Sequence, residues 1–166
     1  MVHRKKVYQN DYSSQLLKLE RYVPRDIENA LVISADEGAV PVWLFQHRPA
    51  FVTITSFVST ERWAKNLENN LEEFSHSLAR LDGPHFDSVQ VLAELPTRYD
   101  FIFLNSINSD CIGLAPKLVK QDGILIFQEY ENYPELTDDF RFLLGEHKQE
   151  FELLSSQDLQ WIVRKL

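Results

Sequence analysis

The sequence has few of the residues on which disulfide-linked or metal-bound folds depend. It contains 1 cysteine, Cys111, among 166 residues, which excludes a disulfide scaffold and a thiolate-rich metal site. With 5 glycines and 7 prolines, the chain is neither fibrous nor of low complexity. Its 5 histidines show no HxH, HxxxH or HExxH spacing, so we expect no metal site.

Basic residues are also in the minority. The chain has 17 Lys and Arg residues against 25 Asp and Glu residues, a net charge of −8, which argues against a broad RNA-binding surface and against anionic membranes. No apolar run approaches the roughly 18 residues of a membrane span. Polar residues, not an apolar segment, follow the basic stretch at positions 3–6, unlike a secretory signal. We therefore expect a cytoplasmic protein with no membrane partner.

Short apolar and β-branched runs alternate along the chain with segments of helical spacing. The runs predict strands, the all-apolar ones being typical of strands buried on both faces of a parallel sheet: Ala30–Ile33, Phe51–Thr55, Phe101–Leu104 and Ile124–Phe127. Helical spacing of apolar residues predicts helices between and before them: 13–22, 40–44, 63–81, 111–120 and 134–144. We expect the helix over 63–81 to break at Asp82–Pro84, a turn at Asp122–Gly123, and the end of the last helix at Gly145.

Two segments depart from this alternation. Residues 88–95 fit a strand and a helix equally well by periodicity alone. The apolar runs 151–154 and 159–163 are joined by four polar residues, which favours an antiparallel hairpin.

This order predicts one α/β domain over residues 1–166, with residues 1–28 as an N-terminal helical extension. The expected architecture has three layers around a mostly parallel sheet of six or seven strands, closed by the C-terminal antiparallel hairpin. Ligands of such sheets bind beyond the carboxyl ends of the strands, at the switch point next to the first strand.

The same order resembles the class I S-adenosylmethionine (SAM)-dependent methyltransferases, which have a Rossmann-like fold. Leu31–Pro41 stands where that family has its glycine-rich loop, and Ser59–Leu67 resembles the helix after its second strand. Asp87–Pro96 resembles the segment with the adenine-side acid, Tyr99–Asn105 the fourth strand, and Lys120–Leu125 the entry to the fifth. The resemblance implies SAM as cofactor, a helix over 88–95, and six cofactor-binding positions: Ser34, Asp36, Gly38, Phe57, Asp87 and Asn105.

The sequence departs from the family at the cofactor itself. Val32 replaces an acid, and Ser34 and Asp36 occupy the first two glycine positions, so that only Gly38 remains. Phe57 stands where the family has the acid that accepts both ribose hydroxyls. These departures predict that the site binds SAM weakly or not at all. Asp87 has two open interpretations, since it suits an adenine acceptor and a helix N-cap equally well.

Three functional hypotheses remain open, and no catalytic residue can be named. The first is a SAM-dependent methyltransferase-like protein that acts on RNA or a small molecule. The second is a cofactor-free domain that binds a protein, a ribonucleoprotein or a second methyltransferase domain, similar to the inactive half of tandem ribosomal-RNA guanine-N2 methyltransferases. The third is a relative of the spermidine synthases, which Asp122–Glu129 and Tyr133–Glu135 resemble, although Asn105 replaces their general base.

Overall fold

The part of the chain that the structure describes forms one seven-stranded sheet with helices on both faces. The computed structural model describes residues 13–34, 39–48, 53–58, 65, 68–69, 72, 81–86, 89–96, 99–105, 109–129, 132–157 and 159–166. The strand order is β3-β2-β1-β4-β5-β7-β6, formed by β1 (Asn29–Ser34), β2 (Thr53–Val58), β3 (Leu81–Phe86), β4 (Tyr99–Asn105), β5 (Val119–Gln128), β6 (Phe151–Ser155) and β7 (Gln160–Lys165). This architecture confirms the predicted α/β fold class.

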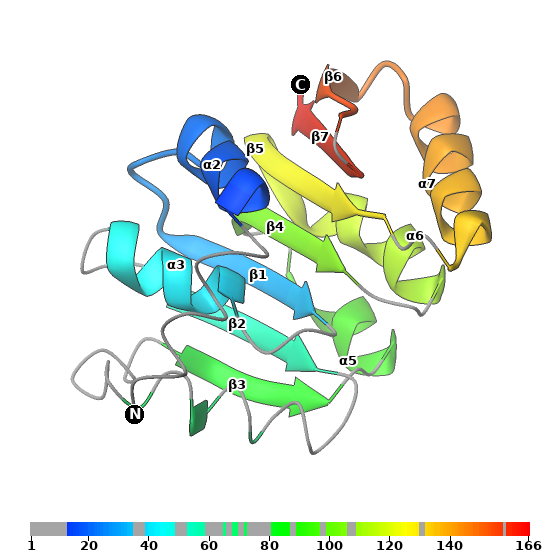
Figure 1. The fold of residues 1–166 in the computed structure, drawn as a ribbon. Helices are drawn as coiled ribbons and strands as arrows, with labels where there is room; N and C mark the ends of the chain where they lie inside the picture. The colour runs from blue at the N-terminus through cyan, green and yellow to red at the C-terminus, as the bar shows by residue number, and fades with distance from the viewer. Residues whose placement is uncertain are drawn as a thin grey trace.

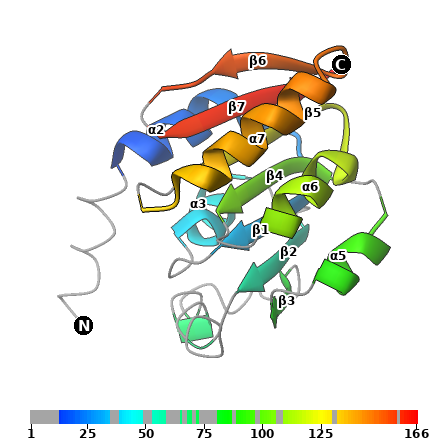
Figure 2. The same cartoon turned by 90° about the vertical axis from the view of Figure 1, so that its right-hand side faces the viewer.

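The helices form the two outer layers (Figures 1 and 2). One face of the sheet carries α2 (Ser13–Tyr22) and α3 (Ala39–His47), and the other carries α5 (Val89–Glu94), α6 (Ser109–Leu118) and α7 (Pro134–Glu146). Of the predicted helix over 63–81, the structure describes residues 65, 68–69, 72 and 81; residues 65, 68 and 69 are helical, and Leu81 belongs to β3.

β1 lies in the middle of the sheet because its side chains are apolar on both faces. Ala30 and Val32 belong to the core beneath α2 and α3, whereas Leu31 and Ile33 belong to the core beneath α5, α6 and α7. All four are buried, which confirms that the apolar run is a strand covered on both sides.

Arg48 fixes the position of α3 relative to α2. Its side chain is 2% exposed, and its guanidinium donates to the carbonyl oxygens of Val23 at 2.7 Å, Pro24 at 2.9 Å and His47 at 2.9 Å. It also lies over the Trp43 ring, 4.5 Å from the centroid. One buried arginine thus satisfies carbonyl groups at the C-terminal ends of both helices.

The helix that the family resemblance implies over 88–95 is confirmed by α5, which covers Val89–Glu94. The C-terminal hairpin is also confirmed, with β7 antiparallel to both β5 and β6. Because β7 is inserted between β5 and β6, β6 returns to the direction of β5, and only β7 is reversed.

Turn-forming residues lie inside two of the strands, and the turn predicted at Asp122–Gly123 was wrong. Asp82–Pro84 lies in β3, whose pairing with β2 shifts register between Asp82 and His85. β3 is an edge strand, where a proline without an N–H is tolerated. Asp122–Gly123 lies within β5 at a similar irregularity, and Gly145 lies within α7, which ends one residue later.

Candidate functional site

The carboxyl ends of the central strands bring predicted site positions together. Ser34 ends β1 and is paired with Val58 of β2 on one side and with Asn105 of β4 on the other. Phe57 is paired with Ile33, one residue earlier. The backbone positions of Ser34, Phe57 and Asn105 therefore lie along one edge of three adjacent strands.

This edge includes the switch point of the sheet. From β1 the chain crosses to α3 on one face, and from the neighbouring β4 it crosses to α6 on the opposite face (Figure 1). Adjacent parallel strands whose connections leave to opposite sides open a crevice at their carboxyl ends, the usual ligand site of such sheets. The predicted location of the site is therefore present in the fold.

Three of the six predicted cofactor positions lie within the residues that the structure describes. Ser34 and Phe57 are placed by their backbones at the edge, and Asn105 is placed there with its side chain buried. Asp36, Gly38 and Asp87 lie outside the described residues.

Val32, which replaces the family's acid, has become part of the core. It is fully buried and belongs to the same apolar cluster as Trp43, Phe101 and Phe103. A carboxylate among these groups would need a charged or hydrogen-bonding partner to offset its burial. The position therefore contributes to packing in this chain.

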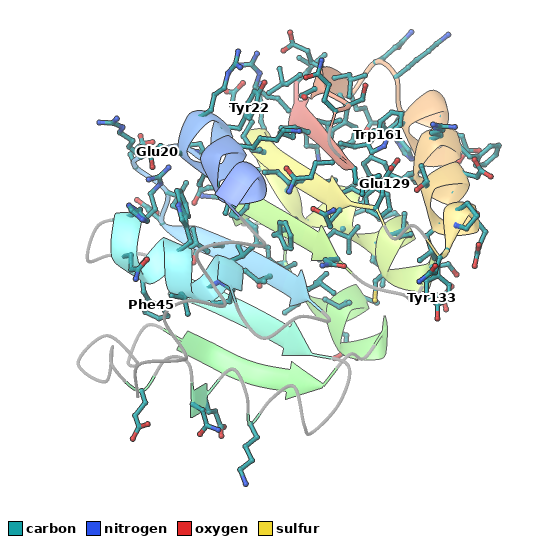
Figure 3. All side chains as sticks on the ribbon, viewed as in Figure 1. Glu20, Tyr22, Phe45, Glu129, Tyr133 and Trp161 are labelled. Atoms are coloured by element: carbon teal, nitrogen blue, oxygen red, sulfur yellow. The ribbon has the colours of Figure 1, made fainter. Side chains whose placement is uncertain are left out.

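Sequence reasoning missed a polar cluster at the carboxyl end of β5. The Trp161 Nε1–H donates to Glu129 Oε1 at 2.6 Å, and Figure 3 shows the two side chains together beside α7. Gln160 Nε2 donates to Gln128 Oε1 at 2.9 Å, and Gln128 Nε2 donates to the carbonyl of Leu159 at 3.1 Å. The signal in the sequence was the pair of polar residues directly after the apolar run of β5.

This cluster holds the start of β7 against the end of β5. Gln128 and Gln160 are both buried and are paired in the strand register, so their side-chain bond satisfies polar groups that water does not reach. Glu129 places a partly exposed carboxylate at the same end of the sheet, two strands from Ser34. Its bond to Trp161 restrains that carboxylate on the α7 side.

The part of the chain that the structure describes has neither a metal-binding cluster nor a membrane-spanning helix. Among those residues, no three histidine, cysteine, aspartate or glutamate side chains gather in a way that would hold a metal ion. Over the same ranges, no helix has the length and apolar character needed to cross a bilayer.

Comparison with known proteins identifies the fold. No protein-family model matches the sequence, and no curated protein matches it. Among solved structures, the O-methyltransferase TomG from Streptomyces achromogenes, in complex with SAM, superposes with a TM-score of 0.73 at 13% identity, covering 93% of this chain and 79% of TomG. The chain has the class I methyltransferase fold.

Two other solved methyltransferases share this fold. An O-methyltransferase from Bacillus cereus, in complex with SAH, matches with a TM-score of 0.66 at 16% identity over 91% of this chain and 78% of its own. A methyltransferase from Geobacter sulfurreducens matches with a TM-score of 0.68 at 11% identity, over 93% of this chain and 77% of its own.

Within the methyltransferase fold, the end of β2 is the position that the resemblance assigns to the ribose. β2 ends in Ser56, Phe57 and Val58, and none of these carries a carboxylate. The end of β2 therefore lacks the carboxylate that the resemblance assigns to the ribose hydroxyls. At the end of β4, Asn105 retains an amide that can accept and donate hydrogen bonds.

Proposed function

We propose that this protein is a SAM-dependent methyltransferase-like protein that binds SAM at the carboxyl ends of β1, β2 and β4. The observation that carries the proposal is the switch point between β1 and β4, in a sheet of the order β3-β2-β1-β4-β5-β7-β6. TomG and the Bacillus cereus enzyme, which share the fold, were solved with SAM and SAH.

We expect this binding to be weak, because the end of β2 lacks a carboxylate. A hydrogen bond to a charged group contributes roughly 1.5–3 kcal/mol. Without a carboxylate at the end of β2, the two ribose hydroxyls would each lack one such bond. Since 1.4 kcal/mol is tenfold in affinity, the loss amounts to about two orders of magnitude or more.

The substrate class we favour is a small molecule. The net charge of −8 does not suit RNA, whose phosphates are bound by lysine and arginine. Two of the structurally similar proteins are O-methyltransferases, which supports a hydroxyl as the acceptor. Cys111 is buried and is the single cysteine of the sequence, so the chain has no internal disulfide, which agrees with the cytoplasmic location that we propose.

A second candidate function is a cofactor-free interaction domain for a protein partner or a second methyltransferase domain. The burial of Val32 in the core favours it, because the position of the family's acid now contributes to packing. Under this alternative, the methyltransferase fold is retained and the crevice holds no SAM.

Isothermal titration with SAM and with SAH distinguishes the two functions. The first predicts one site per chain, with an affinity that Phe57→Asp tightens and Phe57→Leu does not. Absence of binding at millimolar SAM, for the wild-type chain and for the double variant Phe57→Asp with Asp36→Gly, would leave the cofactor-free domain as the better explanation.

A further inference from the structure

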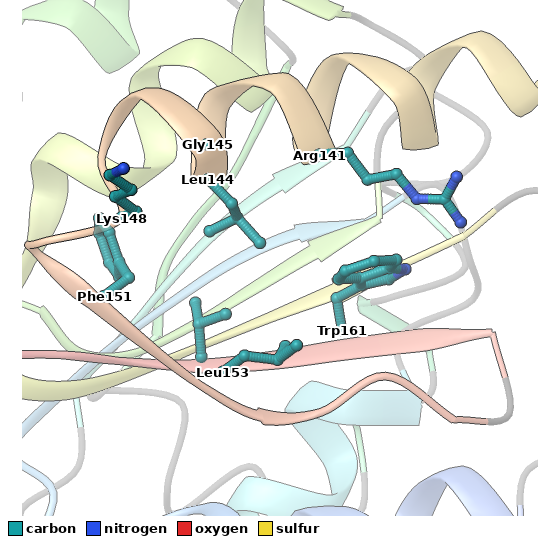
Figure 4. A pocket seen from close by; sticks show the side chains of 8 residues that line it. Arg141, Leu144, Gly145, Lys148, Phe151, Leu153 and Trp161 are labelled. Carbon is teal, nitrogen blue, oxygen red and sulfur yellow. The ribbon is translucent and has the colours of Figure 1, made fainter.

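A groove of about 270 Å³ lies between α7 and the outer strands β6 and β7 (Figure 4). It is separate from the crevice proposed for SAM, since its lining includes no residue from β1, β2 or β4. Its volume is near the lower end of the range for small-molecule sites, roughly 300–1,000 Å³.

On the helix side, the groove is lined by residues from one face of α7 and the turn that follows it. Arg141, Leu144, Gly145 and Lys148 follow one another at spacings of three, one and three residues, so they lie on the same side of α7 and its C-terminal turn. Gly145 leaves this wall hollow, because a Cβ built there meets no atom within 4 Å.

The sheet wall is apolar and only partly covered. Phe151 and Leu153 of β6 lie beside Trp161 and Val163 of β7, with Leu153 and Val163 paired directly. The helix packs toward the centre of the sheet, where its Phe140 stacks on Phe127 of β5 at 4.5 Å. The outer strands are therefore left open, and Leu153 is 51% exposed.

A positive charge lies at each end of this apolar surface (Figure 4). Arg141 is already engaged, since its guanidinium lies 5.2 Å from the Trp161 ring centroid and 3.8 Å from Asp138 Oδ1. Lys148 has no ion-pair partner among the residues that the structure describes. In a protein of net charge −8, a lysine beside an apolar groove suits an anion with an apolar body.

We propose that this groove binds a medium-chain aliphatic carboxylate. The carboxylate pairs with Lys148, and the chain runs between Leu144 and Leu153 to end against Trp161. Arg141 and Lys148 are seven residues apart, or about 10.5 Å along a helix, which sets the length of chain that the groove accommodates. This groove is separate from the crevice proposed for SAM, so a negative result for carboxylate binding would not contradict the proposed function.

Titration calorimetry with straight-chain carboxylates from butanoate to dodecanoate, in the absence of SAM and below micelle-forming concentrations, tests the proposal. Each added methylene should tighten binding about fourfold, equivalent to about 0.8 kcal/mol, until the chain fills the groove and the gain stops. Octylamine and octanol should each bind more weakly than octanoate. A gain that continues to dodecanoate, or equal binding of octylamine and octanoate, would overturn the proposal.

Two pairs of variants locate the site. Gly145→Leu fills the groove and should abolish octanoate binding, whereas Gly113→Leu, at a helical glycine of α6 that also has open space, should leave it unchanged. Lys148→Gln should weaken binding about three- to fivefold, whereas Lys148→Arg should not. Circular dichroism checks that each variant is folded.

A competing occupant is a protein surface, and sedimentation velocity separates the two. If octanoate does not bind, or if Gly145→Leu leaves its binding unchanged, the proposal is wrong. It is also wrong if the wild-type chain self-associates and Gly145→Leu abolishes that association, since a second copy would then cover the groove.

Discussion

Asp100 connects the first residues of the two central strands, and removing it should destabilise the whole sheet. Its Oδ2 accepts the backbone N–H groups of Glu28 at 3.0 Å and Asn29 at 2.9 Å, and its Oδ1 accepts from Lys120 Nζ at 3.1 Å. One carboxylate at the start of β4 thus fixes the entry to β1 and contacts the start of β5.

The magnitude follows from the charge and the exposure of this group. Each hydrogen bond to a charged partner contributes roughly 1.5–3 kcal/mol, but the Asp100 side chain is 26% exposed and water can replace part of what is lost. We expect Asp100→Ala to lower the free energy of unfolding by about 2–4 kcal/mol, less than the sum of three bonds. Asp138→Ala is the matched control, because its exposed pair with Arg141 should contribute under about 1 kcal/mol.

The same contacts predict how stability depends on pH. Burial acts to raise the pKa of Asp100, but the backbone N–H groups of Asn29 and Glu28, together with Lys120, outweigh it and leave the pKa below its ordinary value. A carboxyl group with a lowered folded-state pKa stabilises the fold above its unfolded-state pKa, about 3.9, and loses that contribution as the pH falls through the folded-state pKa.

Urea unfolding followed by circular dichroism, at pH 7 and in steps down to pH 3, measures both effects. The difference between wild type and Asp100→Ala should be greatest at neutral pH and should shrink below about pH 4. A difference under 1 kcal/mol at pH 7, or one that grows as the pH falls, would refute the role given to this carboxylate.

Three further predictions concern other parts of the molecule. Arg48→Met should lower the free energy of unfolding by about 3–5 kcal/mol, measured by urea unfolding, because it leaves buried carbonyl groups unpaired. Gly123→Ala should cost about 1–3 kcal/mol in the same assay, since its Cβ would lie 2.6 Å from Val119 Cγ2, whereas Gly145→Ala has open space and should gain up to about 1 kcal/mol. Phe57→Asp should raise SAM affinity by at least about tenfold in titration calorimetry, because a carboxylate at the end of β2 can accept the ribose hydroxyls.

The fold could be predicted because its strongest signals are local and repeated. The apolar run Ala30–Ile33 has no polar face, and only a central strand covered on both sides accommodates it. The turn prediction at Asp122–Gly123 failed because it relied on the same local signals. Asp122 has a φ of 64° and Gly123 lies against the Asp100 carbonyl, so both retain turn-like properties, but they occupy an irregularity inside β5.

The polar cluster at the end of β5 could not be predicted, because its partners are remote in sequence. Glu129 and Trp161 are 32 residues apart, as are Gln128 and Gln160. Their contacts depend on the insertion of β7 beside β5 and not beyond β6, which no periodicity records. Sequence reasoning therefore identified the edge at which the site lies but missed these four side chains.

The burial of Val32 limits which substitutions can restore SAM affinity. The acid that the family has at this position would, in this chain, replace a methyl-bearing side chain that is fully buried among apolar groups including Phe101 and Phe103. A buried, unpaired carboxylate costs several kcal/mol or is held neutral, so Val32→Glu would lower stability before it could contribute to SAM binding. The end of β2 carries no such cost if the added carboxylate faces the crevice and water. We therefore expect Phe57→Asp to raise SAM affinity and Val32→Glu not to raise it. By this reasoning, the missing carboxylate at the ribose position limits SAM binding, and the missing acid at Val32 does not.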